Sequence, residues 1–362
     1  MSVKIKAVLV QEMVSKSVKG ASNNKMLPIT SLMEVRQTAG EFVLTTTDGT
    51  NYLYVREHVE DESEFVVVVP VEQFSKLISK ITSEYISLNL EDSCLTVTGN
   101  GTYKIQLPLD ENGSLVKYPN PYGRSNSNNA FSETEVSSEV LKSIVNTNKV
   151  ALPVTLDVPS YSNYYIGTNA IVTTDTYKIC RHMAEIVEAP ILVSPQLMNL
   201  VEVFDSEPVT ITCSDDEILM ESKNITICGV LSDGIEEYAI DAINGLIDEE
   251  FNSMCKLSKD ELLLALDRIS LFIEAYDKNS VSLTFSADSV TLSSKLATGT
   301  ETLDYIESKN AVPYTCDIDI TMLQSQLKSQ VSNAVNLYYG QDKAIKLVED
   351  NVTRIVALLE DE

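Results

Sequence analysis

The same arrangement of elements occurs three times along this chain of 362 residues. In each copy an apolar strand leads into a helix, at residues 66–81, 189–204 and 312–331, so the copies lie about 120–125 residues apart. This spacing is far longer than that of a solenoid repeat and close to the size of one domain. The repetition therefore predicts three similar domains rather than one large core.

The segments around each copy repeat as well. Strands of period-two alternation precede each copy, hairpins follow it, and a further helix begins each repeat. Ser258 and Glu261 have the spacing of a capping box at the start of one such helix. The pattern predicts an α+β fold in which each repeat packs two helices on antiparallel sheets. The preceding strands are 42–55, 170–183 and 290–306, the hairpins 85–109, 209–231 and 335–359, and the initial helices 8–20, 137–150 and 258–273.

Two segments have the composition of domain boundaries. Residues 118–130 are rich in Pro, Asn, Ser and Gly, and residues 244–253 contain Gly245 and an acidic run. The predicted domains are 1–124, 128–246 and 250–362.

The charge of the chain restricts its partners. Fifty-three Asp and Glu residues against 27 Lys and Arg give a formal net charge of −26, whereas phosphate contacts need Lys and Arg. Taken as a whole, this balance predicts an acidic protein with protein partners. No apolar run approaches the roughly 18 residues of a membrane span, and the N-terminal apolar run contains charges and no cleavage site. We therefore expect a cytoplasmic protein.

The sequence shows no arrangement of residues that is typical of a catalytic or a metal site. The six cysteines form no C-x-x-C pair and there are only two histidines, His58 and His182, so neither a zinc site nor a Ser/His or Cys/His arrangement is expected. We find no Gly-rich phosphate loop and no nucleophile elbow. The sequence predicts buried reduced thiols, no catalytic residue, no metal and no cofactor.

Several short motifs occur in an order and at a spacing that carry a family resemblance. They are Leu27-Pro28-Ile29, Thr47-Asp48-Gly49, Val69-Pro70, Thr174-Asp175, and Leu231-Ser232-Asp233-Gly234 followed by Tyr238. With them, the chain resembles the bacterial sliding clamp, the beta subunit of DNA polymerase III. The third repeat matches by pattern more than by letters.

This resemblance implies a non-enzymatic processivity factor. Two chains joined head to tail would form a ring around duplex DNA, without sequence-specific readout, with helices lining the hole. The expected partners are the replicative DNA polymerase, the clamp loader and a second copy of the chain, in the cytoplasm of a bacterium or of an infected cell if a phage encodes the chain. The alternative from another class is an acidic β-rich scaffold or DNA-mimic protein that binds proteins only. The archaeal and eukaryotic clamps are a further alternative, but they use two domains per chain and three chains.

Basic residues recur on five of the six predicted helices. Lys16 and Lys19 are three residues apart and Lys76 and Lys80 four apart, so each pair shares a helix face. The sixth helix carries Glu202 and no basic residue. A solvated polar face is the alternative for any one helix, but the repetition predicts a mildly basic bore with weak phosphate contacts. The predicted DNA-facing residues are Lys16, Lys19, Lys25, Lys76, Lys80, Lys142, Lys149, Arg268 and Lys328.

The resemblance also implies a pocket between the second and third domains, bordered by the C-terminal tail, for a short apolar peptide of the polymerase or loader. This chain departs from the family at several of its positions: Thr176 stands for a Gly, Lys178 for an Arg, Glu236 for a Pro and Ile240 for an Arg. The tail lacks the family's Pro-containing apolar end, so we expect a different peptide. A last β-strand is the alternative interpretation of residues 355–359. The predicted pocket residues are Thr174, Thr176, Tyr177, Lys178, Ile179, Ile240, Asp319, Met322, Ile355, Val356, Leu358 and Leu359.

At the dimer interface, the resemblance pairs two residues of a first-domain strand with two apolar residues closing the first helix of the third domain. The matching residues are Tyr103 and Ile105 against Phe272 and Ile273. Burial of Phe272 in the core is the alternative.

Overall fold

The computed structural model describes residues 2–60, 63–91, 93–119, 132–155, 158–274 and 279–359. The chain divides into two compact units, one of residues 1–141 with 196–231 and one of residues 142–195 with 232–362. The segment predicted as the first domain boundary lies largely outside the described residues. The three predicted domains therefore stay a prediction.

The first unit contains two antiparallel sheets. One has the strand order β1-β6-β7-β8 and the other the order β5-β2-β3-β4-β16-β15-β14-β9. The strands are β1 (Ser2–Lys6), β2 (Leu32–Thr38), β3 (Glu41–Thr47), β4 (Tyr52–His58), β5 (Phe65–Pro70), β6 (Tyr85–Glu91), β7 (Cys94–Thr98), β8 (Thr102–Gln106), β9 (Ser132–Ser137), β14 (Pro208–Cys213), β15 (Glu217–Glu221) and β16 (Ile225–Val230). The helices are α1 (Ala7–Ser17), α2 (Val71–Ile78) and α4 (Pro195–Asn199), followed by the 3₁₀ turn η6 (Leu200–Val203), and α3 (Ser138–Asn148) begins in this unit.

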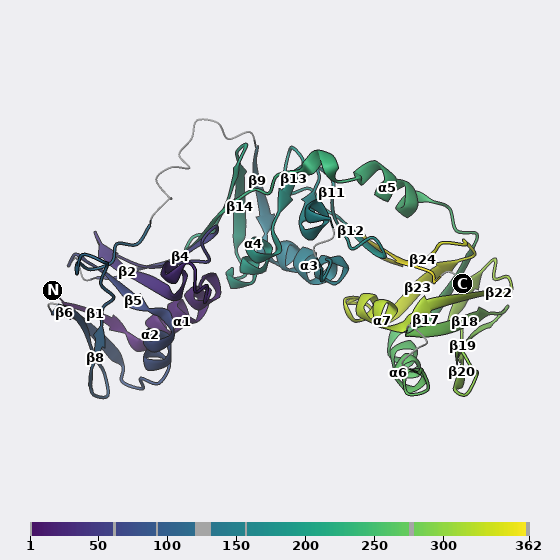
Figure 1. The fold of residues 1–362 in the computed structure, drawn as a ribbon, viewed down its shortest axis with the longest axis horizontal. Coiled ribbons are helices and arrows are strands. Elements are labelled where there is room, and N and C mark those ends of the chain that lie inside the picture. Colours follow the sequence, from purple (N-terminus) through teal and green to yellow (C-terminus); the bar gives the residue numbers. More distant parts are fainter. Residues whose placement is uncertain are drawn as a thin grey trace. The chain divides into compact units, whose positions relative to one another are not determined.

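The helices of the first unit form where apolar side chains recur at helical spacing. Helix α1 buries Val10, Met13 and Val14, and α2 buries Phe74 and Ile78, so each has one apolar face. The two helices lie side by side, with α1 against β3 and β4 and α2 against β5 (Figure 1). Their other faces are left to the polar residues between these positions.

The second unit also contains two antiparallel sheets. One has the order β13-β10-β11-β12-β25-β24-β23-β17-β21 and the other the order β20-β19-β18-β22. The strands are β10 (Tyr164–Ile166), β11 (Ala170–Thr174), β12 (Lys178–Met183), β13 (Ile191–Val193), β17 (Ser253–Ser258), β18 (Ser280–Phe285), β19 (Ser289–Ser294), β20 (Thr300–Asp304), β21 (Glu307–Lys309), β22 (Tyr314–Asp319), β23 (Ala334–Tyr339), β24 (Ala344–Glu349) and β25 (Val352–Ala357). The helices are α5 (Ile240–Asp248), α6 (Lys259–Ser270) and α7 (Ile320–Lys328), and the 3₁₀ turn η4 (Lys149–Ala151) follows α3.

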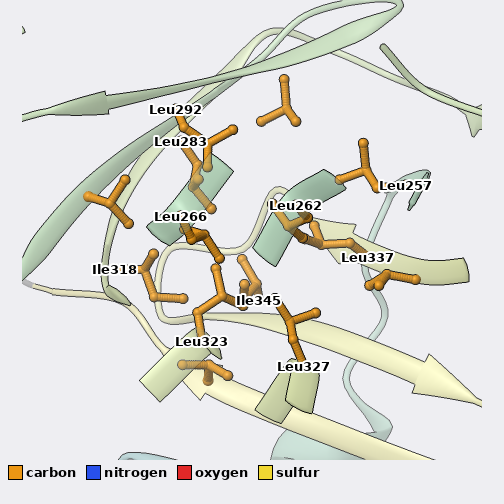
Figure 2. Packing of buried hydrophobic residues seen from close by; sticks show 14 of the residues in the cluster. Leu257, Leu262, Leu266, Leu283, Leu292, Ile318, Leu323, Leu327, Leu337 and Ile345 are labelled. Carbon is orange, nitrogen blue, oxygen red and sulfur yellow. The ribbon is translucent and has the colours of Figure 1, made fainter. Parts of the chain in front are cut away.

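The core of the third repeat lies where its helices meet strands of both sheets. Figure 2 shows Leu262 and Leu266 of α6 and Leu323 of α7 packed with Leu283 of β18 and Ile345 of β24, all of them buried. Strands of this repeat alternate between buried and partly exposed residues, as in Ser289–Ser294. Alternation of this kind leaves one face of each strand to the core.

The predicted hairpins and helices are confirmed element by element. Each repeat contains two three-stranded meanders, of which β2-β3-β4 and β6-β7-β8 are the first pair. The capping-box serine also acts as predicted, because Ser258 Oγ accepts a hydrogen bond from the Glu261 N–H at 3.4 Å. Five of the six cysteines are buried and Cys94 is half-buried, and all six are free thiols.

Helix α5 was missed by the sequence analysis, which took its C-terminal half for a domain boundary. Ile243 and Ile247 are buried one turn apart and hold the helix on the sheet. Gly245 lies on the open side, where an added Cβ would meet no atom within 4 Å. The residue that looked like a chain breaker is therefore a helix residue facing away from the sheet.

Candidate functional site

A pocket of about 270 Å³ lies in the second unit, on the face of the nine-stranded sheet that carries α5. Strand β12 pairs with β25 so that Ile179 lies opposite Ile355, and β25 pairs with β24 so that Ala357 lies opposite Ala344. Ile243 and Ile247 of α5 pack in one cluster with Ile179 and Ile355. The floor of the pocket is thus apolar and its position is set by strand register. The lining residues are Thr176, Tyr177, Ile179, Leu246, Glu249, Phe251, Gln341, Asp342, Lys343, Ala344, Ile355 and Ala357.

Four of the predicted pocket residues line this cavity: Thr176, Tyr177, Ile179 and Ile355. Three further predicted residues, on β11, β12 and β25, do not line the cavity but pack or bond within the fold. Thr174 is buried at the end of β11, and Val356 is buried on the opposite side of β25 from Ile355. Lys178 is folded back, with its Nζ 2.8 Å from the Val150 carbonyl and 3.2 Å from Asp175.

The remaining predicted pocket residues lie elsewhere in the second unit. Ile240 lines a neighbouring cavity with Tyr165 and Asn244. Asp319 caps α7, with its Oδ1 accepting the Thr321 and Met322 N–H groups at 2.7 and 3.0 Å. Met322 and Leu358 pack on the core of the third repeat, and the Leu359 N–H donates to the Asp317 carbonyl at 2.9 Å. Ile355 and Ala357 belong to the last strand and at the same time form part of the pocket floor.

The wall contributed by α5 and the segment after it is held by basic side chains of the sheet. Arg181 Nη2 lies 2.8 Å from Asp248, and Lys346 donates to the Glu249 carbonyl at 2.6 Å. The Lys346 ammonium also lies 4.6 Å from the centre of the Phe251 ring. Burial lowers the pKa of Lys346 more than the nearby Asp248 carboxylate raises it. Arg181 and Lys346 thereby fix the positions of Leu246 and Phe251 at the pocket.

The inner face of β25 carries a buried ion pair. Arg354 is fully buried, with its Nη1 3.2 Å from Glu349 Oε2. Its Nε and Nη2 donate to the Oγ and the carbonyl of Ser329, at 3.1 and 3.3 Å. Glu349 Oε1 accepts the Ser332 N–H at 2.5 Å. Because Ser329 ends α7, this pair ties the helix to the strand whose other face lines the pocket.

The predicted DNA-facing residues fall into two groups. Lys16 Nζ lies 2.7 Å from Asp205 and 3.1 Å from Glu12, and Lys19 lies 3.5 Å from Glu202. Although burial opposes the charged form of Lys16, its hydrogen bonds to Asp205 and Glu12 raise its pKa. These two lysines therefore pair α1 with the segment that follows α4.

Most of the other basic residues are exposed. Lys76 and Arg268 pair with Glu72 and Glu301 on the surface, where an ion pair contributes little to stability. Lys149 donates to Asn146 at 2.8 Å, and Lys142 is half-buried. Lys25, Lys80 and Lys328 are exposed as well.

Comparison with known proteins identifies the fold. No family model and no curated protein matches this sequence. The beta subunit from the DNA polymerase of Streptococcus pyogenes is 18% identical, with both chains covered completely and a TM-score of 0.87. The sliding clamp from Bacillus subtilis is 15% identical with a TM-score of 0.84, and the DNA polymerase III beta subunit from Borrelia burgdorferi is 15% identical with a TM-score of 0.85, again over the whole of both chains.

The chain has the sliding-clamp fold. The fold that the repeats and the resemblance predicted is thereby confirmed over the whole chain, including the third repeat, which matched by pattern more than by letters. The described residues contain no helix long and apolar enough to cross a membrane. They also contain no cluster of His, Cys, Asp and Glu that could hold a metal ion.

The four predicted interface residues differ in exposure. Tyr103 on β8 is 42% exposed and Phe272, just after α6, is 50% exposed with its ring against Gly299. Ile105 is 1% exposed, and Ile273 packs on the core of the third repeat. Tyr103 and Phe272 are therefore available to a second copy, whereas Ile105 already lies within the first repeat. The interface itself stays a prediction.

Sequence reasoning missed most of the outer pocket wall. Leu246 and Phe251 come from α5 and the segment after it, and Gln341, Asp342 and Lys343 from the turn between β23 and β24. The helical spacing of Ile240, Ile243 and Ile247 was the signal that could have placed α5 over the sheet. The turn residues carried no such signal, because only strand register brings them to the pocket.

Proposed function

We propose that this chain is a DNA sliding clamp. Two copies joined head to tail encircle duplex DNA and tether the replicative polymerase, without catalysing a reaction. The site of action is the cytoplasm, where the DNA is replicated. The sliding-clamp fold favours this function over an acidic scaffold that binds proteins only.

The observation that carries the proposal is the way the sheets join. The eight-stranded sheet joins four strands of the first repeat to four of the second through β4 and β16, and the nine-stranded sheet joins the second to the third through β12 and β25. Each joint pairs the last strand of the first meander in one repeat with the last strand of the second meander in the following repeat. The corresponding strands that no joint within the chain uses are β20 of the third repeat and β8 of the first. Among the described strands, β20 pairs only with β19 and β8 only with β7, so both have a free edge.

These free edges support a head-to-tail contact between copies. An unpaired edge is a template for pairing with another chain, and β20 of one copy against β8 of the next would repeat the joint used twice within the chain. Tyr103 lies on β8, and Phe272 packs on Gly299 next to β20. A head-to-tail contact closes into a ring when its rotation allows, and closure at two copies is what the resemblance implies.

Contact with DNA in this proposal is weak and independent of sequence. Lys25, Lys80 and Lys328 are its main phosphate contacts, with Lys76, Lys142, Lys149 and Arg268 in support. Few contacts of this kind suit a protein that moves along the duplex, because affinity would oppose sliding. Lys16 and Lys19 serve chiefly the ion pairs with Asp205 and Glu202.

The pocket beside α5 is the proposed docking site for the polymerase and the clamp loader. Its floor of Ile179, Ile355 and Ala357 suits an apolar side chain of a short peptide. The peptide can bind through this side chain without adding a strand to the edge of the sheet. The residues outside the cavity, such as Asp319 and Met322, position this part of the fold.

Replacing Leu246 by Asp tests this docking site. We expect at least about ten-fold weaker binding of the replicative polymerase encoded by the same genome, because one buried leucine contributes about 1.5–3 kcal/mol. Surface plasmon resonance with immobilised clamp measures the affinity. The matched control is Leu264→Asp, since Leu264 is also half-exposed but lies on α6 and does not line the pocket. Equal binding by both variants places the docking site elsewhere.

A further inference from the structure

The turn between β11 and β12 borders the pocket and holds a threonine in a conformation that favours glycine. Thr176 has φ of +75°, in the left-handed region, where a β-branched side chain is strained. The turn is fixed around it by two side chains. Thr174 Oγ1 accepts the Thr176 N–H at 3.0 Å, and Asp175 Oδ1 accepts the N–H groups of Tyr177 and Lys178 at 3.0 and 2.7 Å.

The first repeat contains the same turn with a glycine at the strained position. Thr47 Oγ1 accepts the Gly49 N–H at 3.0 Å, and Asp48 Oδ1 accepts the N–H groups of Thr50 and Asn51 at 2.9 and 2.8 Å. Gly49 has φ of +111°. One hydrogen-bonding scheme therefore occurs twice in the chain, with glycine in the first repeat and threonine only beside the pocket. The turn does not need the threonine side chain for its own geometry.

The position of Thr176 indicates what its side chain does. It lines the cavity together with Tyr177, which is 61% exposed, and with Ile179 and Leu246. A residue kept in a strained backbone conformation at a binding site points to a function of its side chain there. Loss of the branched side chain would widen the cavity on this side.

We propose that Thr176 is a specificity-determining residue of the pocket: its branched side chain narrows the cavity, so that an extended peptide with an aliphatic anchor is accepted and one with an aromatic anchor is disfavoured. This inference rests on the proposed docking function of the pocket. The inference specifies which kind of anchoring side chain the docking pocket accepts.

The test compares peptides with a small or a large anchoring side chain on the wild-type protein and two variants of Thr176. A displayed heptapeptide library is selected on the wild-type protein, and the best binder is synthesised with its anchor as Leu or as Phe. Fluorescence anisotropy gives the ratio of the two dissociation constants. We expect Thr176→Gly to shift this ratio about ten-fold or more toward Phe, because a pocket discriminates by about this factor for small changes in apolar volume. Thr176→Val keeps the branch and should keep the wild-type ratio.

Stability gives a second, independent measurement. Thr176→Gly should raise the melting temperature by about 2 °C, as relief of left-handed strain does. Ala39→Gly is the matched control, because Ala39 also has a positive φ, +51°, but lies in the turn between β2 and β3 and does not line the pocket. This control should raise the melting temperature without changing the ratio of dissociation constants.

The outcomes separate the inference from the function beneath it. If the selected peptides bind Leu246→Asp as well as the wild type, the pocket is not the docking site and both proposals fail. If binding depends on Leu246 but Thr176→Gly leaves the ratio unchanged, the docking function stands and the role of Thr176 is overturned. A lower melting temperature for Thr176→Gly overturns the strain argument.

Discussion

Replacing Glu349 by Ala will lower the free energy of unfolding of the second unit by about 3–5 kcal/mol, the usual effect of removing one partner of a buried ion pair. The substitution leaves the fully buried Arg354 without its carboxylate at 3.2 Å. It also removes the acceptor of the Ser332 N–H. The large effect comes from the charge left behind in the interior rather than from the attraction that is lost.

Thermal unfolding followed by circular dichroism measures this loss, with an expected fall in melting temperature of at least about 6 °C. Glu72→Ala is the matched control, because Glu72 pairs with Lys76 on the surface and its side chain is 81% exposed. That variant should change the melting temperature by about 1 °C or less. Replacing Glu349 and Arg354 together by Met should restore part of the loss, since no charge then remains buried. If Glu349→Ala behaves like Glu72→Ala, the buried pair is not what holds α7 to β25.

Replacing Phe272 by Glu is expected to convert a dimer into monomers. Phe272 is half-exposed and packs on Gly299 next to the free edge of β20. Burial of such a side chain contributes about 1.5–3 kcal/mol, which raises the dissociation constant of each interface by about 10- to 150-fold. A closed dimer has two such interfaces, so both weaken together.

Light scattering after size exclusion measures the mass. The wild type should give about 80 kDa, twice the 40.0 kDa of one chain, and Phe272→Glu should give about 40 kDa. Val331→Glu is the control, because Val331 is also an exposed apolar residue but lies after α7. A variant that keeps the wild-type mass would exclude Phe272 from the contact between copies.

Much of this fold could be predicted because many of its strands alternate between buried and more exposed residues. In the hairpin of residues 335–359, β23 and β24 bury every second residue, whereas β25 buries Arg354, Ile355 and Val356 in succession. The helices followed in the same way from apolar side chains at helical spacing, as in α2 with Phe74 and Ile78. These signals lie within one strand or helix. They predict the structure because the apolar face of each strand or helix is the face that becomes buried.

The parts that could not be predicted depend on contacts between distant segments. Nothing near Lys16 in the sequence shows that, besides Glu12, it also pairs with Asp205, 189 residues away. Tyr103 and Ile105 share one side of β8, and only packing shows that Ile105 is covered while Tyr103 is not. The pocket was predicted only in part for the same reason: the family resemblance placed Ile179 and Ile355 there, but Leu246 and Phe251 reach it only through α5 and the segment after it.

The central claim is that a closed ring, and not affinity, holds this protein on DNA. The most direct measurement compares its retention on nicked circular DNA and on the same DNA linearised, each after incubation with ATP and the clamp loader encoded by the same genome. The account predicts long retention on circles, even in salt that disrupts phosphate contacts, and rapid loss from linear DNA, because a mobile ring leaves by the ends. Equal retention on the two forms, or none on either with a loader shown to hydrolyse ATP on primed DNA, would contradict the ring and favour an acidic scaffold that binds proteins only.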